Sequence, residues 1–117
     1  MNQRHRGAHG EHLARAYLEQ RGCSIVDHNF HCRYGEIDLI IRKNRAYRFV
    51  EVKLRSTHDY GIPQESVVAR KQRKIKKTAL IWLKQRHLPI DSEIHFDVVA
   101  ISTVSGQPRF EYIEDAF

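Results

Sequence analysis

Apolar residues recur at helical spacing in two stretches of the chain, residues 10–21 and residues 63–85. Such spacing predicts two amphipathic helices, each with one buried face. Gly22 supplies a stop signal for the first helix. Pro63 is acceptable in the first turn of the second helix, and Pro89 lies beyond its end.

Shorter stretches that are rich in Ile and Val, or that alternate in polarity, predict strands. These are residues 23–27, 36–42, 47–54, 94–101 and, more weakly, 109–113. Residues 57–63 are predicted to form a loop. No linker or repeat divides the 117 residues, so a single domain spanning 1–117 is expected. The order α-β-β-β-α-β-β predicts an α/β fold in which helices flank a mixed sheet.

Acidic and basic residues share one face of the two central strands. A tight turn within the polar segment 43–46 would place Asp38 opposite Glu51 and Glu36 opposite Lys53. Apolar residues support this register, because Ile37 with Val52, and Leu39 with Val50, would then share the other face.

Two carboxylates directly opposite each other destabilise a sheet unless positive charge lies between them. Lys53 could supply part of that charge, but a divalent cation such as Mg²⁺ is favoured because it binds carboxylate oxygens. Such an ion polarises phosphoryl oxygens and activates water, while a neighbouring lysine orients the nucleophile. The site therefore predicts metal-dependent phosphodiester hydrolysis. The ordinary alternative is an exposed polar sheet face with an incidental ion pair.

Positive charge is concentrated in the second predicted helix. The formal net charge is +6, from 20 Lys and Arg against 14 Asp and Glu. Residues 66–90 contain no acid and eight basic residues, namely Arg70, Lys71, Arg73, Lys74, Lys76, Lys77, Lys84 and Arg86. Of these, Arg70, Lys74 and Lys77 share one helical face and are expected to contact phosphates of a nucleic acid. A solvated lysine-rich face is the alternative.

The histidines and cysteines offer a competing zinc hypothesis. Two groups are involved, His5, His9 and His12 near the N-terminus, and Cys23, His28, His31 and Cys32. Neither group has paired Cys-x-x-Cys spacing, and the N-terminal histidines are expected to be frayed.

Cellular location follows from cysteine content and hydrophobic patterning. Two cysteines do not make a disulfide scaffold, which favours a reducing, cytoplasmic setting. The longest apolar run, Ala79 to Leu83, has five residues, far fewer than a membrane span needs. The first thirteen residues contain no apolar core of a secretory signal.

Short segments along nearly the whole chain match a known family in order and spacing. They are Gly7-x-x-Gly10-Glu11, Tyr17-Leu18, Gly35-Glu36-Ile37-Asp38-Leu39-Ile40, Phe49-Val50-Glu51-Val52-Lys53-x-Arg55, Gly61-x-Pro63, Lys71 and Phe96-Asp97-Val98-Val99. Together they resemble the bacterial YraN-like family of small, poorly characterised proteins. The core of that family is similar to the restriction-endonuclease-like, or PD-(D/E)xK, nucleases, particularly archaeal Holliday-junction resolvases.

The resemblance implies a site that binds Mg²⁺ or Mn²⁺. Asp38 and Glu51 would be the metal carboxylates, with the Val52 carbonyl as a third ligand. Lys53 would be the catalytic lysine, and Glu11 the helix-borne acid that completes the site. Helical spacing by itself places Glu11 at the border of the buried helix face. The ordinary alternative is an acid in the first turn that is favoured by the helix dipole.

The resemblance also bears on binding partners. Arg55 and Lys71 join the expected nucleic-acid-binding residues, and Lys71 is expected nearer the active site than the others. The implied substrate is DNA with branched or single-stranded features, and a homodimer is consistent with related resolvases. His95 departs from the family pattern, which has Arg there, and Asp97 is expected to be a structural acid paired with a basic side chain.

A restriction-endonuclease-like DNA-processing nuclease is therefore the favoured function. A non-catalytic nucleic-acid-binding module with the same fold is the main alternative. An adaptor protein is the third, but it would need both the basic helix and the acid pair to be accidental.

Overall fold

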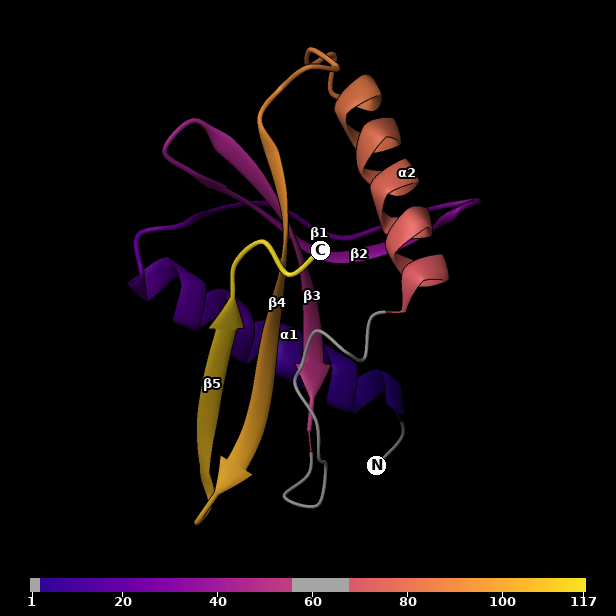
Figure 1. The fold of residues 1–117 in the computed structure, drawn as a ribbon. Coiled ribbons are helices and arrows are strands. Elements are labelled where there is room, and N and C mark those ends of the chain that lie inside the picture. Colours follow the sequence, from indigo (N-terminus) through magenta and orange to yellow (C-terminus); the bar gives the residue numbers. More distant parts are fainter. Residues whose placement is uncertain (1–2, 56–67) are drawn as a thin grey trace.

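The helices and strands of the protein follow one another in the predicted order. The computed structural model describes residues 3–55 and 68–117 (Figure 1). The elements there are α1 (Gln3–Gln20), β1 (Ser24–Cys32), β2 (Gly35–Lys43), β3 (Ala46–Leu54), α2 (Ala69–Gln85), β4 (Ile94–Val104) and β5 (Gln107–Ile113).

Both helices differ from prediction at their N-terminal ends. Helix α1 begins at Gln3, earlier than the predicted residue 10. The residues before Gly10 have no apolar side chains at helical spacing, so the sequence pattern could not predict this part of the helix. His5, His9 and His12 therefore lie on this helix, and fraying of its N-terminal end stays a prediction. Helix α2 begins at Ala69, after Val68 in extended conformation. The predicted loop 57–63 and the predicted helical residues 63–67 lie outside the described residues. Neither α1 nor α2, as far as they are described, is long and apolar enough to cross a membrane.

The five strands form one mixed sheet in the order β1-β2-β3-β4-β5. All neighbours are antiparallel except β3 and β4, which are parallel and are joined through α2. The tight turn between β2 and β3 is confirmed, since Lys43 pairs with Ala46 and Asn44 takes a positive φ of 59°. Strand β1 continues to Cys32, beyond the predicted residue 27.

The sheet is covered on both faces (Figure 1). Helix α2 packs Ile75, Ala79 and Trp82 on one face, against buried residues that include Ile40 and Phe49. Helix α1 covers the other face with a second cluster, whose buried members are Ala14, Leu18, Cys23, Leu39, Ile41, Val50, Val99 and Ile101. Central strands are therefore buried on both faces, as in three-layer α/β folds.

A buried acid ties β4 to its neighbours. Asp97 is fully buried, and its Oδ1 lies 3.0 Å from Arg48 Nη1. The Tyr112 hydroxyl donates to Asp97 at 2.5 Å, and the Asp115 backbone N–H donates at 2.9 Å. The prediction of a structural acid paired with a basic side chain is confirmed.

His95, at the position that departs from the family pattern, joins two acids near this network. Its Nε2 lies 2.9 Å from Glu93 Oε2 and its Nδ1 lies 2.6 Å from Asp115 Oδ1. The carboxylates raise the pKa of the imidazole, with the bond to Glu93 as the main cause. His95 thus has a structural role at the N-terminal end of β4.

Candidate active site

Strands β2 and β3 separate at the segment that carries Glu36 and Asp38, and this separation builds the site. The predicted register is confirmed from the turn up to the pair Leu39 with Val50, which is the last pair of the ladder. Beyond it, the Val52 backbone N–H donates to Asp38 Oδ2 at 2.8 Å. The Asp38 carboxylate therefore takes the hydrogen bond that a continuing strand would have made, and the predicted pairs of Asp38 with Glu51 and Glu36 with Lys53 lie past the end of the ladder.

Ile37 does not lie on the face of the sheet that was predicted for it together with Val52. It is buried in the α2-side cluster, whereas Val52 packs with the α1-side cluster. Their predicted common face is wrong because β2 has left β3 at this point and follows β1, where Ile37 pairs with Phe30. Leu39 and Val50, inside the ladder, share the α1 side as predicted.

Glu51 is held between two lysines from different elements. Lys71 Nζ, in the first turn of α2, lies 2.9 Å from Glu51 Oε1, and Lys53 Nζ lies 3.9 Å from the same atom. The Glu51 side chain is 12% exposed and that of Lys71 is 41% exposed, so the carboxylate is shielded from bulk water while the lysine stays accessible. Lys71 therefore lies nearer the acids than the rest of the basic helix face, as predicted.

Charge crowding perturbs the titration of these groups. Burial and the neighbouring Glu51 raise the pKa of Asp38 to about 7, although the Val52 N–H favours its charged form. Burial and the adjacent Lys71 lower the pKa of Lys53. Burial alone would lower the pKa of Lys71 as well, but its bond to Glu51 outweighs burial and raises it. The two lysines thus differ in character, with Lys53 the more easily deprotonated.

This donor set fits a hard divalent cation. Asp38 and Glu51, both half-buried, repel each other, and the Lys71 ammonium already lies where positive charge relieves that repulsion. Mg²⁺ is commonly held by one or two carboxylates while it retains several waters. The described residues contain no cluster of three or more His, Cys, Asp or Glu side chains suited to a metal. The same finding gives the zinc hypothesis no support in the described part of the chain.

Comparison with known proteins identifies the family. The family model described as "Uncharacterised protein family UPF0102" matches residues 10–101. The chain belongs to UPF0102. This is the YraN family that the sequence motifs resemble. The UPF0102 match covers β2, β3 and α2, so all four members of the Asp38, Glu51, Lys53 and Lys71 cluster lie within it.

Relatives in UPF0102 span most of the chain. The UPF0102 protein of Geobacter sulfurreducens is 47% identical over 95% of this chain and 87% of its own length. That of Rhodococcus opacus is 47% identical over 95% of this chain and 94% of its own. That of Geobacter metallireducens is 50% identical over 95% and 90%, respectively.

Glu11 lies within the UPF0102 match but makes a contact of its own. It is 8% exposed on α1, so it borders the buried face as predicted. Its Oε1 lies 3.1 Å from His28 Nδ1 of β1. Helical spacing within α1 could not predict this contact, because His28 lies on another element. The roles of Glu11 and of the Val52 carbonyl at a metal stay predictions.

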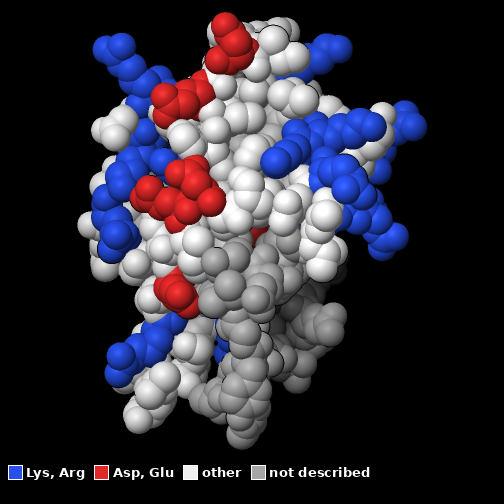
Figure 2. Space-filling model, viewed as in Figure 1, with Lys and Arg blue, Asp and Glu red and all other residues white. Residues whose placement is uncertain are grey.

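The predicted nucleic-acid-binding residues of this UPF0102 chain differ in exposure. Arg70, Lys74 and Lys77 are exposed on α2, and Lys77 Nζ lies 4.3 Å from the centre of the Tyr34 ring. Arg55 is half-buried just after β3, where its backbone N–H donates to the Ile101 carbonyl at 2.8 Å. Figure 2 shows Lys and Arg gathered on the right, over α2, whereas on the left further Lys and Arg lie among most of the visible acids.

Proposed function

We propose that the protein is a metal-dependent phosphodiesterase that cleaves DNA. The carrying observation is the Asp38–Glu51 pair, placed where β2 and β3 part, with a lysine of lowered pKa on the same strand as Glu51. In this proposal Asp38, Glu51 and the Val52 carbonyl hold Mg²⁺ or Mn²⁺. Such an ion, when bound, polarises the scissile phosphate and makes a bound water more acidic.

The chain's own side chains have separate roles in this proposal. Lys53, whose pKa is lowered by burial and by Lys71, orients the attacking water and accepts its proton when it is neutral. Lys71 keeps Glu51 neutralised until a cation binds, through its 2.9 Å contact. Both lysines would then be free to contact the negatively charged phosphate.

The substrate proposal rests on charge. Helix α2 carries exposed cations and no acid, and its first turn reaches the acid pair. A phosphate backbone lying along α2 would therefore lead to the site. DNA with branched or single-stranded features, acted on in the cytoplasm by a monomer or homodimer, is the form we expect.

The experiment is a cleavage panel with single strands, duplexes, flaps and four-way junctions, in Mg²⁺ and in Mn²⁺. Glu51→Gln keeps side-chain volume but removes the charge that holds the cation. It should still bind DNA, while cleavage falls by about 10² or more. Lys53→Met should separate binding from cleavage in the same way, because it removes the group that orients water. Glu19→Gln, on the exposed face of α1, is the matched control and should cleave normally.

Two results would overturn the catalytic proposal. One is tight binding by the wild type with no cleavage of any substrate. The other is cleavage that neither Glu51→Gln nor Lys53→Met reduces. The first result would favour the non-catalytic nucleic-acid-binding module, whose support is the basic face of α2.

A further inference from the structure

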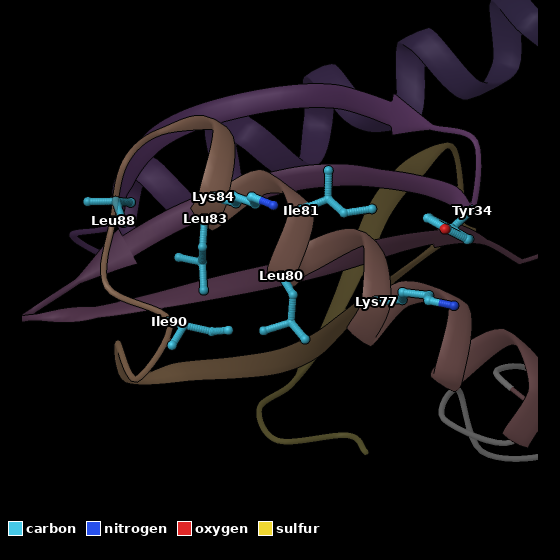
Figure 3. Close-up of a pocket in the computed structure, with 8 residues that line it drawn as sticks. All are labelled: Tyr34, Lys77, Leu80, Ile81, Leu83, Lys84, Leu88 and Ile90. Atoms are coloured by element: carbon cyan, nitrogen blue, oxygen red, sulfur yellow. The ribbon is translucent and has the colours of Figure 1, made fainter.

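An apolar groove lies beside the C-terminal half of α2, apart from the acid pair. Its volume is about 540 Å³. Its lining comes from α2, from the turn between β1 and β2, and from the segment before β4, as Figure 3 shows. The lining residues are Tyr34, Lys77, Leu80, Ile81, Leu83, Lys84, Leu88 and Ile90. None of these residues belongs to the Asp38, Glu51, Lys53 and Lys71 cluster.

Two large aliphatic side chains are exposed at the groove. Leu80 is 42% exposed and Ile90 is 77% exposed, and the two side chains point toward each other across the groove (Figure 3). Leu83, at the base, is buried in the core. Adjacent exposed aliphatic residues of this kind mark binding surfaces more often than solitary ones do.

Positive charge borders the apolar surface. Lys77 and Lys84 line the groove, and Lys77 closes one end by lying over the Tyr34 ring (Figure 3). Helix α2 contains no acid to neutralise these lysines internally. An apolar floor with a cationic rim is complementary to a segment that has apolar anchors and negative charge.

We propose that this groove binds an acidic peptide segment of a partner protein, with one or two Leu, Ile or Phe side chains seated between Leu80 and Ile90. The aliphatic walls suit such anchors, whereas a nucleobase would need aromatic or hydrogen-bonding walls, and Tyr34 supplies these at one end alone. A second copy of this chain is disfavoured, because a two-fold contact across α2 would bring Lys77 and Lys84 against their own equivalents.

The test measures binding of fluorescent decapeptides to the full-length protein. The probes are rich in Asp and Glu and carry Leu, Ile or Phe at two positions. Matched peptides replace the apolar residues with Ser, or the acids with Lys. We expect the acidic apolar peptides to bind and both matched sets to bind at least about tenfold more weakly.

Variants locate the binding. Leu80→Ser and Ile90→Ser should each weaken it about tenfold, and Lys84→Gln should weaken it more at low salt than at high salt. Val104→Ser is the matched control, because Val104 is also 42% exposed but lies at the end of β4, outside the groove. DNA cleavage by these variants is measured in parallel, so failure of the groove and failure of the nuclease proposal are distinguished.

Three outcomes would overturn the proposal. In the first, acidic apolar peptides bind no better than their Ser-substituted forms, or Leu80→Ser and Ile90→Ser bind them as the wild type does. In the second, these two variants lose oligonucleotide binding and leave peptide binding unchanged, which assigns the groove to nucleic acid. In the third, they abolish a concentration-dependent dimer seen by sedimentation, which assigns it to self-association.

Discussion

At the scale of single residues, Asp38 has opposing influences on its charge. Its carboxylate accepts the Val52 N–H at 2.8 Å, a contact that favours the charged form. Burial and the nearby Glu51 oppose that contact and prevail, so the pKa rises to about 7. The folded protein thus keeps Asp38 partly protonated near neutral pH when no cation is bound.

This shift predicts how stability depends on pH. The unfolded chain releases the Asp38 proton near pH 3.8, whereas the folded chain retains it until about pH 7. In EDTA, the wild type should therefore lose stability relative to Asp38→Asn as pH rises from about 4 to about 7, with a constant difference above that range. The measurement is the difference in Tm between the two proteins across this pH window.

A cation provides the counterpart of that measurement. Millimolar Mg²⁺ or Mn²⁺ should raise the Tm of the wild type at pH 7.5, because an ion bound to the folded state stabilises it by mass action. Asp38→Asn should show no such gain. The assigned site would be contradicted if the Tm of the wild type and of Asp38→Asn followed the same pH dependence in EDTA and rose equally when the metal was added.

At the scale of elements, α2 joins three surfaces. Its N-terminal half brings Lys71 to Glu51 and exposes Arg70, Lys74 and Lys77, and its C-terminal half, from Lys77 on, lines the apolar groove. The positions of these side chains follow from helical periodicity. A single straight helix can therefore guide a polyanion to the site while leaving a second binding surface beyond it.

The exposed basic face of α2 gives a prediction about salt. Replacing Arg70, Lys74 and Lys77 together with Gln should weaken DNA binding similarly for every sequence. The slope of log affinity against log salt should become shallower by roughly 0.9 for each lost duplex contact. Arg45→Gln, in the β2–β3 turn at the opposite end of β3 from Glu51, is the control and should leave the slope unchanged. An unchanged slope in the triple variant would show that this face is merely solvated.

Sequence patterning predicted those elements whose side chains alternate cleanly. The β2–β3 register was predictable because a one-residue slip would have mixed the acids with the apolar set that contains Leu39 and Val50. The full length of β1 was not, because its second half is largely polar and lies at a sheet edge, where burial imposes no alternation. The Lys71–Glu51 contact depends on how α2 crosses over the sheet between β3 and the parallel strand β4. Local periodicity does not encode that placement.

At the scale of the whole molecule, the Asp97 network joins β3, β4, β5 and the C-terminal segment. Arg48 on β3 and Tyr112 on β5 converge on one carboxylate, and the chain just after β5 adds the Asp115 N–H. Near it, the Ala116 N–H donates to the Phe96 carbonyl at 2.7 Å, and the Phe117 ring stacks on that of Phe96. This network therefore fixes the edge strand β5 and the C-terminal segment relative to β3, the strand that carries Glu51.

Removing that carboxylate should destabilise the entire fold. Asp97→Asn removes the negative charge closest to the largely buried Arg48 and should lower the free energy of unfolding by about 3 kcal/mol. For a domain of ordinary stability, that loss is a large fraction of the total. Urea denaturation measures it, with Asp91→Asn, an exposed substitution before β4, as the control. A loss in the Asp97 variant no larger than in the control would show that the network contributes little.

The parallel pairing of β3 and β4 has a consequence for refolding. The β1–β2–β3 and β4–β5 units each join neighbours in the chain, whereas β3 meets β4 only after the segment between residues 54 and 94 has closed. Until that step, β3 presents an unpaired apolar edge that can join the edge of another molecule. We expect the fraction of native protein recovered after dilution from urea to fall as protein concentration rises. A yield independent of concentration would mean that β4 docks before such encounters occur.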